Sequence, residues 1–159
     1  MNTVKGSDLA KYIISRCLEK NCPTTNLRLQ YYLYLSRIEY FKRYKKELCD
    51  TEMVCREYGP TSLDVYYDYT MFSGNHILLR YDVKLPEDVK SVVDDIIRKY
   101  HDIEIYKLIK ECKKPNSPYS MALEECPMYP RITLNIIESY IESELILNMI
   151  KSLTKLEKE

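Results

Sequence analysis

The sequence of 159 residues contains no tryptophan, three glycines and two histidines. Three scattered glycines cannot build a Walker or dinucleotide-binding loop, because these phosphate loops need several glycines at short fixed spacings. His76 and His101 stand alone, and no GxSxG nucleophile motif is present. Nothing in the pattern indicates a reaction centre, and we expect a protein that is not an enzyme.

Long hydrophobic runs and a charge excess are also missing. No apolar run approaches the roughly 18 residues that read as a membrane span, and the first residues lack the basic-then-apolar pattern of a signal peptide. We therefore expect a cytoplasmic protein without a membrane segment. The 24 Lys and Arg residues balance the 24 Asp and Glu residues, so the chain as a whole does not attract a polyanion.

Cysteine is present, but not at the spacing of a metal site. The six cysteines are Cys17, Cys22, Cys49, Cys55, Cys112 and Cys126. Zinc sites show short paired spacings such as CxxC, whereas the closest pairs here have four and five residues between them. We expect reduced, half-buried thiols, with no bound metal and no cofactor.

Tyrosine supplies nearly all of the aromatic surface, with 16 tyrosines against two phenylalanines. A buried tyrosine needs a hydrogen-bond partner for its hydroxyl group, so we expect many of these rings at the edge of the core or on a contact surface.

Hydrophobic periodicity predicts one mainly helical domain over residues 1–159, with about six or seven helices, a small two-stranded antiparallel β ribbon and a long C-terminal helix. The expected helices span Asp8–Lys20 with Ser7 as N-cap, Asn26–Glu47 at the centre of the fold, Leu63–Phe72, 86–100 and Asp102–Lys110. Residues 113–130 are expected to form a loop with one helical turn near Tyr119–Glu124. For the ribbon, we expect residues 51–57 to pair with the alternating segment Ile77–Leu85, and Gly59-Pro60 to form a turn.

The last 25 or so residues predict one amphipathic helix over residues 131–157. Apolar side chains recur along it in steps of three or four residues, including Ile141, Leu145, Met149 and Leu153. Such a helix is longer than a small domain needs. Its end is expected either to project into solvent or to pack on a second chain, which makes a homodimer through this helix possible.

Three segments resemble one known family. They are TNLRLQYYLY at 25–34, YGP at 58–60 followed by VY at 65–66, and YHDIEIYKL at 100–108 with SPY at 117–119. Together with the first helix they are similar to the Panacea domain, the SocA-like or GepA-like antitoxin domain of bacteria and phages, over residues 8–125. The family's usual tryptophans are absent, and Arg56, Tyr106 and Tyr119 stand in their places.

The resemblance implies an antitoxin that neutralises, by direct binding, a toxin encoded beside it. One characterised type in the family acts as a protease adaptor for its toxin. The motif residues that the resemblance singles out as partner-binding candidates are Asn26, Gln30, Tyr34, Tyr58, Gly59, Pro60 and Tyr66. Two interpretations of them stay open: internal hydrogen-bonding groups that lock the second helix to the Gly59-Pro60 turn, or part of a tyrosine-rich groove for a partner.

Two other functions remain as alternatives. A diverged member on a phage or other mobile element could bind and inhibit a host defence protein. The cationic residues Lys42, Arg43, Lys45 and Lys46 leave open a nucleic-acid-binding regulator, although they also suit a solvated last turn of a helix. The charge balance makes nucleic acid the less expected partner.

Overall fold

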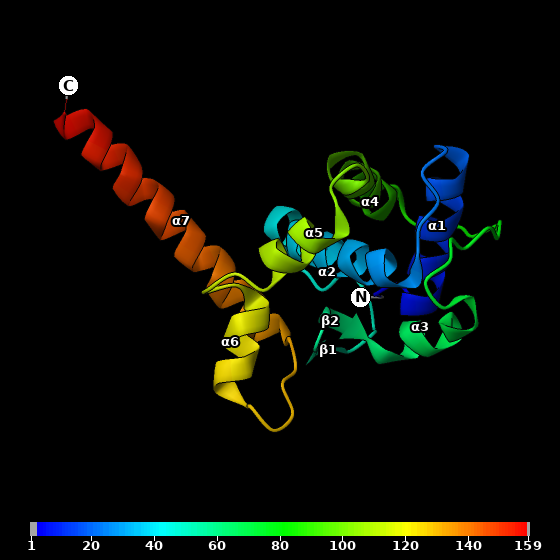
Figure 1. Ribbon diagram of the computed structural model, residues 1–159. Helices are drawn as coiled ribbons and strands as arrows, with labels where there is room; N and C mark the ends of the chain where they lie inside the picture. The colour runs from blue at the N-terminus through cyan, green and yellow to red at the C-terminus, as the bar shows by residue number, and fades with distance from the viewer. Residues whose placement is uncertain (1–2, 159) are drawn as a thin grey trace.

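The computed structural model describes residues 3–158, so residues 1–2 and 159 of the expected domain lie outside the described residues. The described chain is mainly helical, as predicted (Figure 1). Its elements are α1 (Gly6–Glu19), α2 (Asn26–Tyr44), β1 (Met53–Arg56), β2 (Gly59–Ser62), α3 (Leu63–Asp68), the 3₁₀ helix η1 (Thr70–Phe72), α4 (Glu87–Tyr100), α5 (Ile105–Cys112), α6 (Pro118–Glu125) and α7 (Leu134–Glu157). No helix in this part of the chain is long and apolar enough to cross a membrane.

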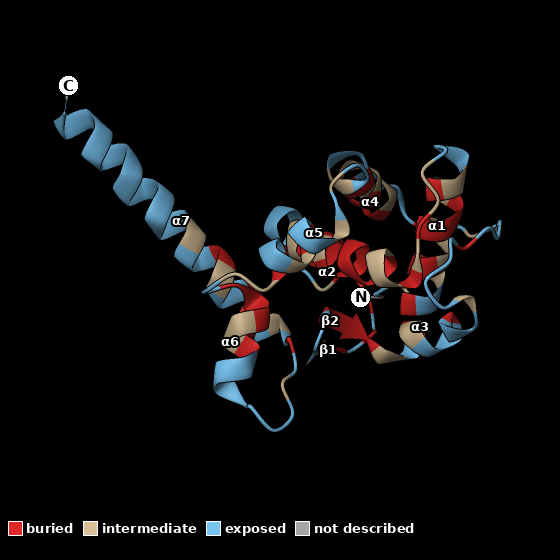
Figure 2. Cartoon of the chain, viewed as in Figure 1, coloured by how far each residue is buried: buried red, intermediate tan, exposed pale blue. Residues whose placement is uncertain are grey.

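Helix α2 lies at the centre of the fold, as its wide apolar arc predicts. It packs against α1, α4, α5, α7 and β2, and Figure 2 shows buried residues gathered along it. The Thr25 hydroxyl caps its first turn by accepting the Arg28 N–H at 3.2 Å. The helix ends at Tyr44 and not at Glu47, because Lys45 adopts the left-handed conformation with φ 57° and its N–H donates to the Phe41 carbonyl.

The start of α1 differs from the prediction. Ser7 is not the N-cap, since the helix begins at Gly6 after Lys5 and no side chain of Lys5 caps it. Instead the Asp50 carboxylate accepts the Gly6 N–H at 2.8 Å, across 44 residues of sequence. A carboxylate at this end also suits the positive pole of the helix dipole. The cap therefore comes from the chain that follows α2, which no local pattern could show.

The β ribbon forms at the predicted place with a different partner strand. β1 pairs antiparallel with β2, with Met53 opposite Ser62 and Arg56 opposite Gly59. The prediction of Gly59-Pro60 as the turn is therefore wrong: both residues begin β2, and the turn is formed by Glu57 and Tyr58.

The segment Ile77–Leu85 is not a strand, contrary to its alternating pattern. The backbone groups of this segment form hydrogen bonds with Ser15 of helix α1 and with Thr24 just before helix α2. The Ser15 hydroxyl accepts the Tyr81 N–H at 2.7 Å and donates to the Tyr81 carbonyl at 3.2 Å, while the Ile77 N–H donates to the Thr24 carbonyl at 2.8 Å. Ile77 and Leu85 are buried, so the alternation reports the side of the segment that faces the core.

Three other predicted segments differ from the structure in where their helices begin or end. The helix expected to run to Phe72 ends at Asp68 and is followed by η1, and the one expected from Asp102 begins at Ile105. The expected single turn near Tyr119 is the two-turn helix α6, capped by the Ser117 hydroxyl, which accepts the Ser120 N–H.

Helix α7 is present as predicted and begins at Leu134, where the Thr133 hydroxyl accepts the Ile136 N–H at 3.3 Å. Its first turns pack on α2 and α6 and bury Ile136, Ile137 and Ile141. Its remaining length projects away from the other helices (Figures 1 and 2).

Candidate partner-binding surface at the ribbon turn

The turn between β1 and β2 is held by side chains from three other parts of the fold. The Tyr119 hydroxyl of α6 donates to the Arg56 carbonyl at 2.7 Å, and the Lys113 ammonium after α5 donates to the Glu57 carbonyl at 2.7 Å. The Tyr31 hydroxyl of α2 donates to the Tyr58 carbonyl. Three consecutive carbonyl groups thus accept hydrogen bonds from side chains, which restrain the backbone of the turn.

Gly59 allows the turn to lie directly on α2. Its φ of 124° is a conformation that other residues rarely adopt. A Cβ atom at this position would lie 2.8 Å from Cε1 and 2.9 Å from the hydroxyl oxygen of Tyr31. The glycine is therefore required both by its backbone conformation and by the close approach of the tyrosine ring.

A second set of hydrogen bonds joins α2 to the far end of the ribbon. The Gln30 side-chain carbonyl accepts the Ser62 N–H at 2.9 Å, and the Gln30 amide donates to the Asn26 carbonyl oxygen at 3.1 Å. The Asn26 amide in turn donates to the Tyr66 backbone carbonyl at 3.0 Å. This relay runs from β2 through one turn of α2 to α3.

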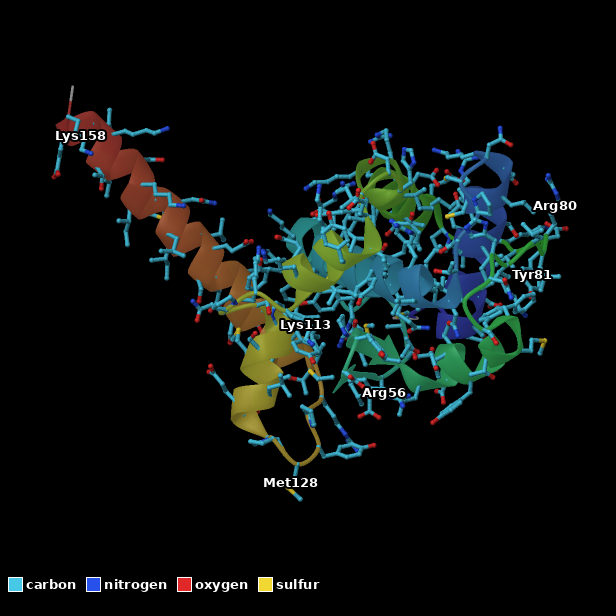
Figure 3. The ribbon with its side chains drawn as sticks, viewed as in Figure 1. Arg56, Arg80, Tyr81, Lys113, Met128 and Lys158 are labelled. Carbon is cyan, nitrogen blue, oxygen red and sulfur yellow. The ribbon has the colours of Figure 1, made fainter. Side chains whose placement is uncertain are left out.

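The side chains above this framework are exposed. Tyr58 is 62% exposed and Tyr67 61% exposed, while Arg56 and Glu57 are also exposed and Tyr66 is half-buried. The Arg56 guanidinium lies over the Tyr66 ring, with its Cζ atom 5.4 Å from the ring centroid. The Tyr66 and Tyr67 rings meet edge to face, with their centroids 5.7 Å apart. We call these five residues, Arg56, Glu57, Tyr58, Tyr66 and Tyr67, the ribbon-turn surface; Figure 3 labels Arg56 on it and Lys113 close by.

The seven motif residues divide into two groups. Asn26, Gln30, Tyr34, Gly59 and Pro60 are buried, and the first two form the relay that locks α2 to the ribbon and α3. Only Tyr58 and Tyr66 can reach a partner. Burial raises the pKa of Tyr34, whose ring is 1% exposed, and keeps this hydroxyl protonated.

Arg56, Glu57 and Lys113 belong to the site although sequence reasoning did not select them. The signal for Arg56 and Glu57 was their place just before the Tyr58-Gly59-Pro60 motif. Lys113 lies 56 residues from the carbonyl that it contacts, and no local pattern points to it.

The site holds one thiol, and its chemistry is suppressed by burial. Burial raises the pKa of Cys55 to about 12, so the thiol is protonated at neutral pH and not nucleophilic. Its Sγ–H points to the Tyr119 carbonyl at 3.4 Å. Within residues 3–158, no group of three or more His, Cys, Asp or Glu side chains is placed to hold a metal ion.

Of the four cationic residues at the end of α2, Arg43 lies beside acidic side chains. Arg43 pairs with Glu39 at 2.9 Å and with Asp95 of α4 at 2.8 Å, while Lys42, Lys45 and Lys46 are exposed. The carboxylates offset part of the positive potential that a polyanion would need.

Comparison with protein-family models, curated proteins and solved structures finds no match to this chain.

Proposed function

We propose that this protein is a protein-binding antitoxin of the Panacea type, which neutralises a toxin by stoichiometric binding through the ribbon-turn surface. The observation that carries the proposal is the turn itself: its three carbonyl groups are held from within, while Arg56 and Tyr58 face solvent. Tyrosine and arginine side chains are favoured in interface hot spots. A rigid backbone beneath them lowers the conformational entropy lost on binding.

Two positions that differ from the family's pattern lie at the ribbon turn and support the proposal that the ribbon-turn surface binds the partner. Arg56 and Tyr119 stand where the family has tryptophans, and here the Tyr119 hydroxyl donates to the Arg56 carbonyl. These two replacements therefore meet at the turn. A toxin docked on an interface of standard size, about 1,600 Å² in total, would have its active surface covered without any covalent step.

Co-expression with the genes beside this one tests the proposal. We expect rescue of growth from one neighbouring toxic product and co-purification of the two proteins. Tyr58→Ala should abolish rescue and co-purification while the variant folds normally, because the ring is 62% exposed. Tyr106→Ala is the matched control, since this ring on α5 is 60% exposed and has no hydrogen bond to the ribbon turn.

The outcomes separate the candidate functions. Rescue that survives Tyr58→Ala and Arg56→Ala would show that another surface binds the toxin. If no neighbouring product is toxic but a host defence protein co-purifies in a Tyr58-dependent manner, the chain is an inhibitor of that protein. Binding to DNA that weakens steeply with salt would instead support the nucleic-acid-binding regulator.

A further inference from the structure

The turn that ends α1 brings two cysteines together. Asn21 adopts the left-handed conformation with φ 58°, and its N–H donates to the Leu18 carbonyl at 3.1 Å. One residue later, the Cys22 N–H donates to the Cys17 carbonyl at 2.9 Å. These two bonds form a Schellman motif, in which the side chains of the residues joined by the outer bond commonly pack on each other. In this chain those two residues are Cys17 and Cys22.

The backbone bond between the two cysteines sets a spacing that a disulfide can span. With standard bond lengths and angles, a bond of 2.9 Å from N–H to carbonyl oxygen keeps the Cα atoms of Cys17 and Cys22 within about 6.5 Å. Disulfides span Cα–Cα distances of about 4.4–6.8 Å. The contact between the side chains also affects ionisation: burial, followed by the neighbouring Cys22 thiol, raises the pKa of Cys17 to about 12. A bond between the two sulfur atoms therefore needs no rearrangement of the backbone.

The two thiols differ in their access to solvent. Cys17 is 0% exposed, whereas Cys22 is partly exposed. A small oxidant from solution therefore meets the Cys22 sulfur first, and the Cys17 sulfur is held behind it. An accessible thiol next to a second thiol is the arrangement found at reversible redox sites, because the second thiol converts the first oxidation product into a disulfide.

A buried hydroxyl group without a partner lies next to the two thiols. Tyr32 of α2 is 0% exposed, and its hydroxyl has no hydrogen-bond partner among the described residues. Burial is the main cause that raises the pKa of Tyr32; the Cys17 thiol raises it further, Arg28 lowers it and Cys22 raises it. Arg28 can only donate to the hydroxyl oxygen, so the hydroxyl hydrogen is left without an acceptor. A thiolate sulfur formed beside it would accept this hydrogen.

We propose that Cys17 and Cys22 form a redox modification site, at which a peroxide oxidises the two thiols to a disulfide. The Cys22 thiolate attacks one peroxide oxygen and the O–O bond breaks, which leaves a sulfenic acid on Cys22 and releases the other oxygen, with a proton, as water. The Cys17 sulfur then attacks the Cys22 sulfur, the S–O bond breaks, and the departing hydroxide takes the Cys17 proton as a second water. The peroxide gains the two electrons that the two sulfur atoms lose. The Tyr32 hydroxyl donates to the Cys17 sulfur while that atom carries negative charge.

The disulfide joins the end of α1 to the segment that leads into α2. The reduced and oxidised chains keep the same fold, because the Schellman bonds already hold the two residues together. The cross-link restricts the unfolded chain, so the oxidised form should unfold at a temperature a few degrees higher. This proposal is independent of the proposed antitoxin function.

Peptide mapping of the full chain after treatment with hydrogen peroxide tests the pairing. Trypsin cleaves after Arg16, Lys20 and Arg28, so the two cysteines fall in separate peptides, 17–20 and 21–28. We expect to recover these peptides joined, lighter by two hydrogen atoms than the separate peptides together, and to separate them again with dithiothreitol.

Two other cysteines serve as comparisons in the same experiment. Cys112 is buried like Cys17 but lies in α5, and it should remain a free thiol. Cys126 is exposed and reports that the peroxide has reacted. Oxidation of Cys126 while Cys17 and Cys22 both stay reduced would overturn the proposal, as would a disulfide that joins either of them to another cysteine instead.

Single substitutions separate the roles of the three side chains. Cys17→Ser should stop the reaction at a Cys22 sulfenic acid, which dimedone labels, whereas Cys22→Ser should leave the buried Cys17 reduced. Tyr32→Phe should slow disulfide formation several-fold without lowering the unfolding temperature, because the hydroxyl that it removes has no partner in the fold. Circular dichroism verifies that each variant keeps its helical content. Disulfide formation at the wild-type rate in Tyr32→Phe would remove Tyr32 from the site, and a Cys17→Ser variant whose Cys22 is never labelled would overturn the order of the two steps.

Discussion

The side-chain carbonyl of Gln30 accepts the backbone N–H of Ser62 at 2.9 Å, although the two residues are 32 positions apart. Both are buried, so this bond serves a strand edge that water cannot reach. The Gln30 amide is used as well, by Asn26, and the side chain is therefore fully committed inside the protein. This relationship explains why a polar motif on α2 can belong to the framework beneath a binding surface and not to the surface itself.

Gln30→Ala should destabilise the protein by about 1–3 kcal/mol, because it leaves the Ser62 N–H buried without an acceptor. Urea unfolding followed by circular dichroism measures this change in the free energy of unfolding. Tyr58→Ala is the comparison, since a 62% exposed side chain should change the free energy by no more than about 0.5 kcal/mol. Equal losses in the two variants would contradict the division between framework and surface.

Gly59→Ala should destabilise by about 2–4 kcal/mol, the sum of a left-handed backbone cost and of overpacking against Tyr31. The overlap is severe, since the new Cβ would lie 2.8 Å from a ring carbon. Gly74→Ala is the matched control, because a Cβ there meets nothing within 4 Å and φ at that position is not left-handed. Thermal unfolding should place the Gly59 variant well below wild type and the Gly74 variant within experimental error of it.

Sequence patterns predicted correctly the helices whose formation depends on residues close together in the chain. The central helix α2 and the helix expected over 86–100 both follow from residues a few positions apart, and the structure confirms them as α2 and α4. The failures involve distant partners. Asp50 caps α1 from 44 residues away, and Ser15 occupies the backbone groups that would have made a strand at Tyr81.

The site shows the same division. Tyr58 and Tyr66 could be selected from the motif, but nothing near Arg56 in the sequence shows that Tyr119 and Lys113 hold the turn around it. The two readings of the motif are now separated residue by residue, with Asn26 and Gln30 inside the fold and Tyr58 outside. Burial decides between them, and burial depends on elements that are far away in the chain.

Arg37 and Glu47 form an ion pair in which Arg37 is buried and Glu47 is partly buried, and we expect its disruption to cost about 1–3 kcal/mol. The Arg37 side chain is 6% exposed, bonds both Glu47 carboxylate oxygens at 2.6 and 2.7 Å, and also donates to the Ile132 carbonyl. Glu47→Gln leaves the guanidinium buried without an opposite charge. Arg37→Met combined with Glu47→Leu should lose less stability than the two single changes added together. Additive losses in urea unfolding would show that the two side chains do not act as a pair.

The Arg43–Asp95 contact should make stability depend on acid pH. The Arg43 guanidinium donates to the Asp95 carboxylate at 2.8 Å and lowers the pKa of that carboxyl. A lowered folded-state pKa means that the stabilisation is fully present above the unfolded value of about 3.9 and is lost as pH falls through the folded value. Because both side chains are about one-third exposed, the gain at pH 7 over Asp95→Asn should be below about 1 kcal/mol.

Urea unfolding of wild type and Asp95→Asn from pH 7 to pH 2 measures this dependence. The difference in the free energy of unfolding between wild type and the variant should stay constant down to about pH 4 and shrink below it. Protonation of Asp95 in the wild type then removes its negative charge, which the asparagine of the variant never carries. It should also shrink in about 1 M salt at pH 7, where charges this exposed are screened. A difference that is the same at pH 7 and pH 2 would assign the effect to packing of the side chain and not to its charge.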